Sequence, residues 1–264
     1  MLYGIARSYN QRATMTITQA TDSGRNRTAG WSITIVVPIY NENDSIPRLV
    51  DALARQLDPD RDRVVFVNDG STDGSAERCD EAAQARPYIR VIHLEPNRGK
   101  TEAIKAGFAA AEGNVVVTMD GDLQDDPQEI PRLLEALDRG LDLVCGWKQQ
   151  RRDPWVKRWS SRVYNGVCAR LFGLHLHDIN SGFKAMRVEV ARAAVLKHDY
   201  HRLIPAVAAA QGFRVGEIPV EHHPRRHGAS KFGFERYWQG LRDAIRLWWE
   251  IRTGRLQRVV GRNS

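Results

Sequence analysis

Short runs rich in valine and isoleucine recur along the chain from residue 33 onward, with little alternation of polar and apolar positions. They read ITIVVP, RVVFVN, IRVIHL, NVVVTM and LDLVCG, and FRVGEIPV follows at residues 213–220. Unbroken apolar runs of this length are typical of strands that are buried on both faces of a parallel sheet. We therefore predict a mostly parallel sheet at the centre of the fold.

The segments between these runs have apolar residues at helical spacing, at 45–57, 74–86 and 100–112. A further helix is indicated after Asp126, which is a favourable N-cap, because Pro127 suits the first turn and Gly140 lies beyond the end. Alternating strands and helices predict a doubly wound α/β fold with helices on both faces of the sheet. Ligands of such folds bind beyond the carboxyl ends of the strands.

The chain divides into three predicted regions. Residues 1–31 are polar and without periodicity, so we expect a flexible tail. Residues 32–233 carry the strand and helix pattern of one α/β domain, and residues 234–264 contain a C-terminal amphipathic helix and a tail.

The C-terminal helix combines apolar and cationic residues. Its predicted apolar stripe and the residues that flank it are Tyr237, Leu241, Ile245, Trp248, Trp249 and Ile251. Arg242 and Arg246 lie elsewhere around the helix. Two interpretations stay open, because packing against the core and a position in a membrane interface both explain this pattern.

The composition indicates an anionic binding partner but does not identify it. The 264 residues are 42% hydrophobic, which is enough for a full core, and the net charge of +7 favours an anionic partner. Nucleic acid is not expected, because no recognised binding module accompanies the charge. Cys79, Cys145 and Cys168 lie far apart without a CxxC pair, so we interpret them as buried thiols in a reducing compartment.

No segment approaches the roughly 20 apolar residues that span a bilayer, and the N-terminus lacks the apolar core of a secretory signal. We therefore expect a cytoplasmic protein, and any contact with a membrane is expected to be peripheral.

A polar cluster follows each of the first four predicted strands. PIYNE follows the first, NDGSTDG the second, PNRGK the third and DGDLQ the fourth, so the four loops should converge on one crevice. The NRGKT sequence is not a Walker loop, because Leu94 stands where that motif needs glycine. The loop after the first strand also lacks the glycine-rich turn of dinucleotide-binding folds.

The DGDLQ sequence predicts a divalent cation site. Asp120 and Asp122 straddle a glycine at a strand end, and Gln124 adds a third oxygen. Mg2+ and Mn2+ prefer such oxygen ligands and often share them with substrate phosphates. A solvated turn is the alternative. In NDGSTDG, Asp69 is placed to accept a hydrogen bond from a base or ribose, while Asp73 suits the start of the next helix.

Six motifs, in order, resemble those of a family 2 glycosyltransferase with the GT-A fold: VVPIYNE, VNDGSTDG, NRGKTEAIKAG, DGDLQDDP, SGFKAMR and RRHGASKFG. The pattern is most similar to the polyprenyl-phosphate sugar synthases, the group that includes dolichol-phosphate mannose synthases. The resemblance extends from about residue 33 to residue 236.

The resemblance implies a role for individual residues. The donor nucleotide would be held by Pro38, Tyr40, Glu42, Val67 and Asp69, with Asp120 and Gly121 beside the ribose and diphosphate. Asp122 and Gln124 would bind the metal. Lys148 matches a position where relatives usually carry arginine, and Arg225 and Lys231 match cations that reach phosphate. Together with Asp122, these three cations are the candidate catalytic residues.

Arg151, Arg152 and Ser230 are candidates for contact with the acceptor. The wider basic segment at residues 148–162 is either a solvated helix face or a surface for a lipid phosphate and anionic headgroups, and we prefer the second interpretation.

Three further residues have ordinary interpretations. His175 and His177 form an HxH pair without another suitably spaced ligand, so we expect a role in a loop. Asp178 matches an acid on the active-site side of the family, and a helix or turn cap explains it as well.

The function that we predict is inverting, metal-dependent transfer of a hexose from a GDP-sugar or UDP-sugar to a polyprenyl phosphate at the cytoplasmic face. A phosphate acceptor is already an anionic nucleophile, so no general base is needed. The first alternative is a soluble hydroxyl acceptor, with Asp178 or Asp153 as the base. The second is a catalytically silent nucleotide-binding or membrane-adaptor protein.

Overall fold

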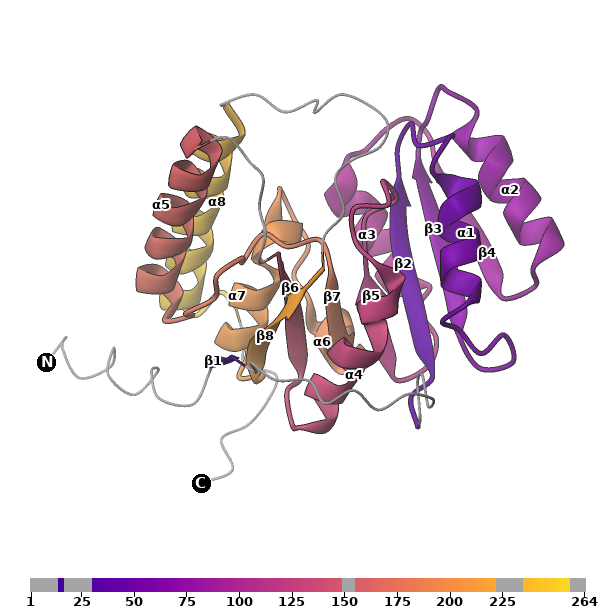
Figure 1. Ribbon diagram of the computed structural model, residues 1–264. Helices are drawn as coiled ribbons and strands as arrows, with labels where there is room; N and C mark the ends of the chain where they lie inside the picture. Colours follow the sequence, from indigo (N-terminus) through magenta and orange to yellow (C-terminus); the bar gives the residue numbers. More distant parts are fainter. Residues whose placement is uncertain (1–13, 17–29, 149–154, 222–234, 257–264) are drawn as a thin grey trace, which may run out of the picture.

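The computed structural model describes residues 14–16, 30–148, 155–221 and 235–256, with side chains left out at 14–16, 155–162 and 235–237. Within these ranges, one sheet of eight strands runs through the molecule in the order β1-β8-β6-β7-β5-β2-β3-β4 (Figure 1). The strands are β1 (Thr14–Thr16), β2 (Ile33–Ile39), β3 (Arg63–Asp69), β4 (Ile89–Leu94), β5 (Val115–Thr118), β6 (Leu143–Lys148), β7 (Lys184–Arg187) and β8 (Val215–Val220). Of the strands that the structure describes, only β7 is antiparallel to its neighbours. The predicted mostly parallel sheet is confirmed.

Helices cover both faces of the sheet (Figure 1). They are α1 (Ile46–Ala54), α2 (Ser75–Ala85), α3 (Lys100–Ala109), α4 (Ile130–Asp138), α5 (Trp155–Phe172), α6 (Val188–Ala193), α7 (Ile204–Ala210) and α8 (Glu235–Arg252). Two 3-10 turns, η1 (Pro127–Glu129) and η2 (Tyr200–Leu203), precede α4 and α7. Helices α5 and α8 pack side by side at the end of the sheet that carries β8.

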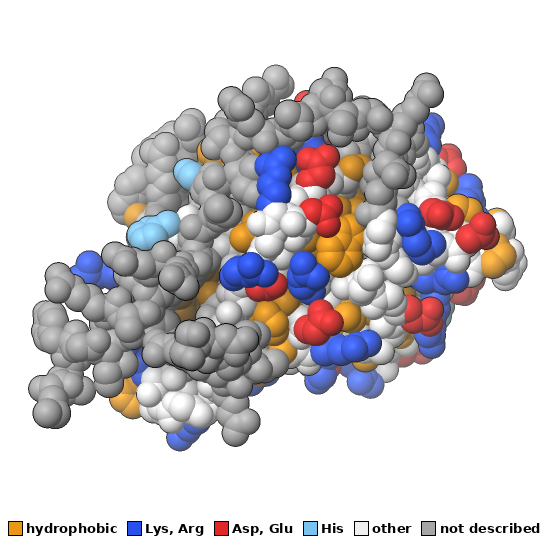
Figure 2. Space-filling view, turned by 90° about the horizontal axis from the view of Figure 1, so that it is seen from below, with side chains coloured by type: hydrophobic (Ala, Val, Ile, Leu, Met, Phe, Trp, Pro, Cys, Tyr) orange, Lys and Arg blue, Asp and Glu red, His pale blue; other side chains and the backbone are white. Residues whose placement is uncertain are grey.

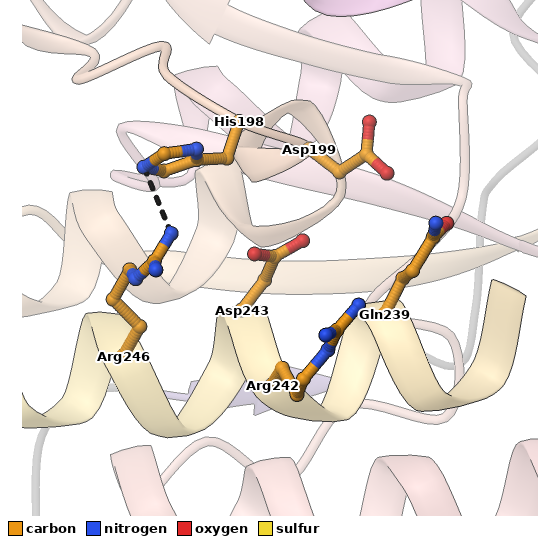
Figure 3. Close-up of a pocket in the computed structure, with 6 residues that line it drawn as sticks. All are labelled: His198, Asp199, Gln239, Arg242, Asp243 and Arg246. Carbon is orange, nitrogen blue, oxygen red and sulfur yellow. Dashed lines mark hydrogen bonds between the residues drawn. The ribbon is translucent and has the colours of Figure 1, made fainter.

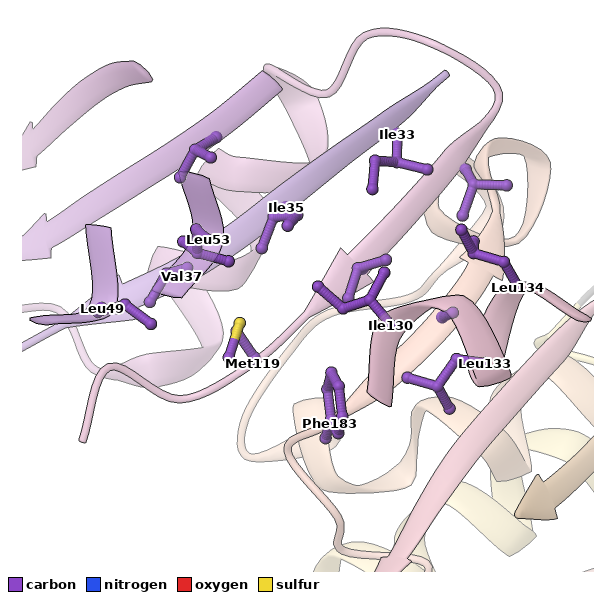
Figure 4. Close-up of a cluster of buried hydrophobic side chains, with 14 of the residues drawn as sticks. Ile33, Ile35, Val37, Leu49, Leu53, Met119, Ile130, Leu133, Leu134 and Phe183 are labelled. Atoms are coloured by element: carbon purple, nitrogen blue, oxygen red, sulfur yellow. The ribbon is translucent and has the colours of Figure 1, made fainter. Parts of the chain in front are cut away.

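Successive side chains of the central strands pack alternately into two hydrophobic clusters, one on each face of the sheet. Ile33, Ile35 and Val37 of β2 point toward α1 and α4, into the cluster drawn in Figure 4. Val36 points to the opposite face, into a cluster shared with α3 and α5 to α8. All four side chains are fully buried, which explains why β2 has no polar alternation.

Helix α4 begins as its sequence predicts, with one difference. The Asp126 carboxylate accepts a hydrogen bond from the backbone N–H of Gln128 at 2.9 Å, and Pro127 follows it. The first turn is the 3-10 turn η1, which leads directly into α4. Gly140, just beyond the helix, has a φ of +99°, a conformation that glycine adopts readily.

Two strands were not predicted. Residues 14–16, expected to lie in a flexible tail, form β1 and pair with β8, Thr14 opposite Val215. Strand β7 contains only four residues and carries two cations, Lys184 and Arg187, so it lacks the apolar run that marks the other strands. It is inserted between β5 and β6.

The predicted apolar stripe of α8 is wrong by one position. Gly240, Ala244 and Leu247 are the buried side of the described helix, whereas Ile245 and Trp249 are 50% and 58% exposed. The stripe that begins at Leu241 therefore lies next to the packed face. The Tyr237 side chain lies outside the described residues.

Ion pairs tie together the strands at the edge of the sheet opposite the polar loops. Asp142 pairs with the Nε atoms of Arg187 at 3.5 Å and Arg214 at 3.2 Å. The Arg187 guanidinium also lies over the Trp31 ring, 5.0 Å from its centre. Figure 2 shows this face from below, with cationic and acidic side chains interspersed. These pairs hold the starts of β6 and β8 against the end of β7.

Candidate active site

The loops after β2 and β3 are joined by hydrogen bonds, as their common position at the carboxyl edge predicts. The backbone N–H of Asn41 donates to Ser71 Oγ at 3.0 Å, and that of Thr72 donates to Asn41 Oδ1 at 2.8 Å. The backbone N–H of Glu42 donates to Ser75 Oγ at 2.8 Å. Asn41 has a φ of +56°, which asparagine tolerates better than most residues. The two predicted donor loops therefore form one rigid unit.

Asp69 links this unit to the loop that follows β4. It is buried, and its carboxylate accepts hydrogen bonds from the backbone N–H groups of Arg98 at 2.7 Å and Gly99 at 2.9 Å. These bonds place the first turn of α3. Contact between Asp69 and the nucleotide base stays a prediction.

Asp73 lies just before helix α2 and binds its first residue, although Gly74 and not Asp73 is the N-cap. Its carboxylate accepts hydrogen bonds from the backbone N–H groups of Ser75 at 3.1 Å and Asn43 at 3.2 Å. Burial alone would raise its pKa, but the Ser75 hydroxyl and these amides donate to the carboxylate and lower the pKa below its usual value.

The closely spaced aspartates after β5 repel one another, and Lys100 is the first of three lysines that offset this repulsion. Its Nζ atom lies 2.5 Å from Oδ1 of Asp120, directly after β5. Burial alone would raise the pKa of Asp120, but the charge and hydrogen bond of Lys100 outweigh it and hold the pKa well below its usual range. Lys100 was not predicted as a site residue, because NRGKT is not a Walker loop and the family resemblance assigned no role to its lysine.

Lys148 forms an ion pair with Asp125, a second carboxylate of the aspartate group after β5. Its Nζ atom lies 3.1 Å from Oδ1 of Asp125, which is 1% exposed. The other oxygen of Asp125 accepts from the backbone N–H of Asp120 at 3.2 Å. Burial would lower the pKa of Lys148, but Asp125 and Asp120 raise it above its usual value. The structure thus brings the predicted cation at residue 148 to the aspartates.

A third lysine completes this charged cluster from β7. Lys184 is buried and donates to the backbone carbonyl of Ser181. Burial lowers its pKa, against the attraction of Asp178 and Asp120. Asp178 is itself buried, and its charge acts on both Lys148 and Lys184. Its role in the reaction stays a prediction. The SGFK sequence was the signal for Lys184, and we used it only for the resemblance.

Glycine 182 lets β7 approach the cluster closely. A Cβ atom at Gly182 would lie 2.8 Å from Oδ1 of Asp120 and 3.0 Å from its Cγ. Any side chain at residue 182 would therefore displace the carboxylate that Lys100 holds.

Asp122 and Gln124 lie on a strained turn beside this cluster. The backbone N–H of Gln124 donates to Oδ1 of Asp122 at 3.1 Å, and both side chains are partly exposed. Leu123 between them has a φ of +60°, which is rare for leucine and typical of turns at functional sites. The carboxylate and amide oxygens fit a hard divalent cation. No cluster of three or more His, Cys, Asp or Glu side chains suited to a metal occurs in the described ranges.

The remaining donor candidates lie in or just after strands β2, β3 and β5. Pro38 lies near the end of β2, and Tyr40, just beyond it, is 42% exposed. Glu42 accepts a hydrogen bond from Ser45 Oγ at 3.2 Å. The Val67 side chain is fully buried and packs with Val65 and Ala103, so a contact with the donor would have to come from its backbone. A Cβ atom at Gly121 would lie 2.6 Å from Ile39 Cδ1, so this glycine permits close packing.

Several predicted residues lie outside the described ranges: Arg151, Arg152, Asp153, Arg225, Ser230 and Lys231. Their roles stay predictions. The three cysteines are free and buried, as predicted.

A separate hollow of about 510 Å³ lies between α8 and the segment that precedes η2 (Figure 3). Its lining residues are His198, Asp199, Gln239, Arg242, Asp243 and Arg246. Arg246 lies 3.0 Å from His198 Nε2. Burial and the neighbouring Asp199 raise the pKa of Asp243. No sequence motif predicted this hollow.

The family model for glycosyl transferase family 2 matches residues 34–194, which contain the aspartates, Lys100, Lys148 and Lys184. The chain belongs to glycosyl transferase family 2. The predicted family is therefore confirmed, and with it the class of enzyme.

Two characterised relatives are similar in sequence. The undecaprenyl-phosphate 4-deoxy-4-formamido-L-arabinose transferase of Edwardsiella ictaluri is 41% identical over 76% of this chain and 63% of its own length. The dodecaprenyl-phosphate galacturonate synthase of Rhizobium johnstonii is 35% identical over 83% of this chain and 67% of its own length. The chain thus spans about two thirds of the length of these relatives.

Solved structures confirm the predicted GT-A fold. Glucosyl-3-phosphoglycerate synthase from Mycobacterium tuberculosis, in complex with phosphoglyceric acid, is 20% identical with a TM-score of 0.68, covering 91% of this chain and 87% of that one. A mannosyltransferase from Pyrobaculum calidifontis, in complex with GDP-Man and Mn2+, is 20% identical with a TM-score of 0.62. The match covers 86% of this chain and 68% of the mannosyltransferase.

Proposed function

We propose that this protein transfers a glycosyl group from a nucleotide sugar to a polyprenyl phosphate. The observation that carries the proposal is the cluster in which Lys100 and Lys148 pair with Asp120 and Asp125 at the carboxyl edge of the sheet. A nucleotide sugar leaves as a diphosphate, and cations held in fixed positions stabilise that leaving group. The names of both relatives contain a polyprenyl phosphate, which supports the acceptor class.

The donor is expected over the joined loops after β2 and β3. Tyr40 is exposed there, and the Asn41 and Ser71 contacts fix the loop backbones. A GDP-sugar or UDP-sugar remains the proposed donor, and a hexose remains the proposed group. The relatives' names contain a modified arabinose and galacturonate, so the sugar is the least constrained part of the proposal.

Asp122 and Gln124 would hold Mg2+ or Mn2+ beside the diphosphate. Their partly exposed oxygens on the strained turn at Leu123 fit such an ion. When bound, the ion would neutralise charge that develops on the diphosphate. Lys148, which pairs with Asp125, would stabilise the negative charge of the same diphosphate.

Transfer then requires one displacement. The acceptor phosphate oxygen forms a bond to the anomeric carbon, the bond to the diphosphate oxygen breaks, and the bond electrons leave with the nucleoside diphosphate. Inversion follows from this single displacement. No proton must be removed from the acceptor phosphate, in contrast with a hydroxyl acceptor, for which a base such as Asp178 would be required.

The test is transfer with purified protein, undecaprenyl phosphate, Mn2+ and a panel of GDP-sugars and UDP-sugars, with the lipid product identified by its mass. We expect one donor to give a glycosyl phospholipid, and we expect EDTA to stop the reaction. Reactions without acceptor measure hydrolysis of the donor. Hydrolysis without lipid product would contradict the acceptor class, and the absence of both activities would favour the silent nucleotide-binding protein.

We also propose that the protein contacts an anionic membrane surface through α8. Trp238, Ile245 and Trp249 are 64%, 50% and 58% exposed and follow helical spacing along one side of α8. Exposed Arg242 and Arg246 flank them. Tryptophan and arginine together suit a helix that lies in the membrane interface. None of the helices that the structure describes is both long and apolar enough to cross a membrane.

A further inference from the structure

Three residues, Glu217, Trp147 and Asn165, hold His177 on the side of the site away from the donor loops. Its Nδ1 atom lies 2.5 Å from Oε1 of Glu217, and its backbone N–H donates to both oxygens of the same carboxylate at 3.0 and 2.8 Å. Its ring stacks on Trp147, with centres 3.9 Å apart and planes 17° from parallel. Asn165 of α5 donates to its backbone carbonyl at 2.5 Å.

These contacts fix the orientation of the imidazole. Glu217 is fully buried in β8, so a charged carboxylate there depends on the donors that His177 supplies. With Nδ1 committed to Glu217, the other ring nitrogen, Nε2, faces away from it. The side chain of His177 is 54% exposed, so a ligand from solvent can reach that edge.

His177 lies close to the charged cluster of aspartates and lysines. His177 directly precedes Asp178, whose charge acts on both Lys148 and Lys184, so the histidine adjoins the charged cluster. Trp147 and Lys148 are neighbours in β6, so their side chains lie on opposite faces of the sheet near its carboxyl edge. In the sheet, Cys145 pairs with Glu217 and Trp147 with Pro219. The stack therefore lies nearer to the carboxyl edge than the carboxylate that anchors it.

The sheet order separates this side from the donor side. Strands β8, β6 and β7 lie on one side of β5, and β2, β3 and β4, whose loops are expected to hold the nucleotide, lie on the other. A second substrate that meets the donor above Asp120 would approach over β6 and β8. His177 and Lys148 lie on that approach.

We propose that His177 binds the phosphate of the acceptor through its Nε2–H group, an inference that rests on the proposed function. The imidazole that donates Nδ1–H to Glu217 and Nε2–H to phosphate is the cationic form, and the buried carboxylate is its counter-charge. Trp147 fixes the plane of the ring by stacking on it. His177 thus holds the nucleophilic oxygen on the β6 and β8 side of the charged cluster.

The experiment compares His177→Ala, His177→Gln and His177→Asn in steady-state transfer to a short, water-dispersible isoprenyl phosphate. The Ala variant should raise the KM for the isoprenyl phosphate at least tenfold. The KM for the nucleotide sugar and donor hydrolysis without acceptor should stay within twofold of the parent. Gln places an amide N–H near the Nε2 position and should recover part of the affinity, whereas Asn should not.

His175→Ala is the matched control, because His175 is exposed on the same loop two residues earlier. It should leave both KM values unchanged. Glu217→Gln should raise the KM for the acceptor in the parent but add nothing in the His177→Ala background. This non-additivity would show that Glu217 acts through His177.

Three outcomes would each overturn the inference. An unchanged KM for the isoprenyl phosphate in His177→Ala, with a fully active parent, would remove the role of His177 and leave the proposed function intact. A parent that hydrolyses its donor but transfers to no isoprenyl phosphate would overturn the proposed function, and this inference with it. Equal loss of transfer and donor hydrolysis in the Ala variant would indicate a structural role only.

Discussion

Lys100 Nζ lies 2.5 Å from Asp120 Oδ1, so the first residue of α3 is joined to the end of β5. The Asp69 carboxylate fixes that turn of α3 through the backbone amides of Arg98 and Gly99. Three loops of the carboxyl edge are therefore linked in series. The position of Asp120 depends on a helix start that itself depends on Asp69.

We expect Lys100→Met to lower transfer about 100-fold, because removal of one preorganised group that stabilises charge typically costs 10²–10³ in rate. The measurement is kcat/KM for the nucleotide sugar. Lys105→Met is the control, because Lys105 is an exposed lysine of the same helix and pairs with Glu102 at the surface. Equal activity of the two variants would show that the Lys100–Asp120 pair is dispensable.

The same variant predicts a change in acid stability. The lowered pKa of Asp120 means that its carboxylate stabilises the folded state above its unfolded pKa of about 3.9, and that this stability is lost as the pH falls through the lower folded value. Without Lys100, the cation that contributes most to lowering the pKa of Asp120 is gone, so the pKa rises toward or above its unfolded value. Urea unfolding should therefore show a stability gap between parent and Lys100→Met that is full at pH 5–7 and narrows below about pH 4. A gap independent of pH would refute this linkage.

The third prediction concerns the metal. Asp122→Ala should abolish Mn2+-dependent transfer without lowering the melting temperature, because it removes a ligand and also a carboxylate that repels its neighbours. The parent should melt at a higher temperature with Mn2+, and the variant should not. Asp126→Asn is the control, because Asp126 instead accepts from Gln128 at the start of η1. Full activity of the parent in EDTA would contradict the metal site.

The sequence predicted the fold well where one physical effect dominated. The unbroken apolar run of β2 reflects burial on both faces, and the Asp126–Pro127 start of α4 is a local hydrogen bond. Strand β7 was missed because its four residues, including the buried Lys184, take their conformation from β5 and β6 on either side. Local pattern carries no signal for such a strand.

The site was predicted in part for the same reason. The aspartates at 120 and 122 share one short motif, so their proximity could be predicted from spacing. The partners that neutralise them come from distant segments. Lys100 lies at the start of α3 and Lys184 in β7, and only the parallel and antiparallel pairing around β5 brings both to Asp120. The Glu217 contact of His177 spans forty residues and was equally hidden.

A small substitution tests how closely β7 must approach Asp120. Gly182→Ala would place a methyl group 2.8 Å from Asp120 Oδ1, so the carboxylate must move away from Lys100. We expect transfer to fall at least tenfold while the circular dichroism spectrum is retained. Gly166→Ala is the matched control, because nothing lies within 4 Å of the added atom in α5. It should stabilise the protein by up to about 1 kcal/mol and leave activity unchanged.

The last prediction concerns the exposed side of α8. Trp238, Ile245 and Trp249 are held in the folded protein with half or more of each side chain in water, while Ala244 and Leu247 pack inward. Trp238→Glu with Trp249→Glu should therefore weaken sedimentation with anionic vesicles and leave the melting temperature unchanged. In the parent, sedimentation should increase with the fraction of anionic lipid and decrease with salt, since each cation near such a surface contributes about 1 kcal/mol that salt screens. Gln84→Glu with Ala85→Glu on α2 adds the same two negative charges at exposed positions on the opposite face of the sheet, and is the control for charge alone. Equal recovery of parent and double variant in the supernatant at low salt would remove the membrane role from α8.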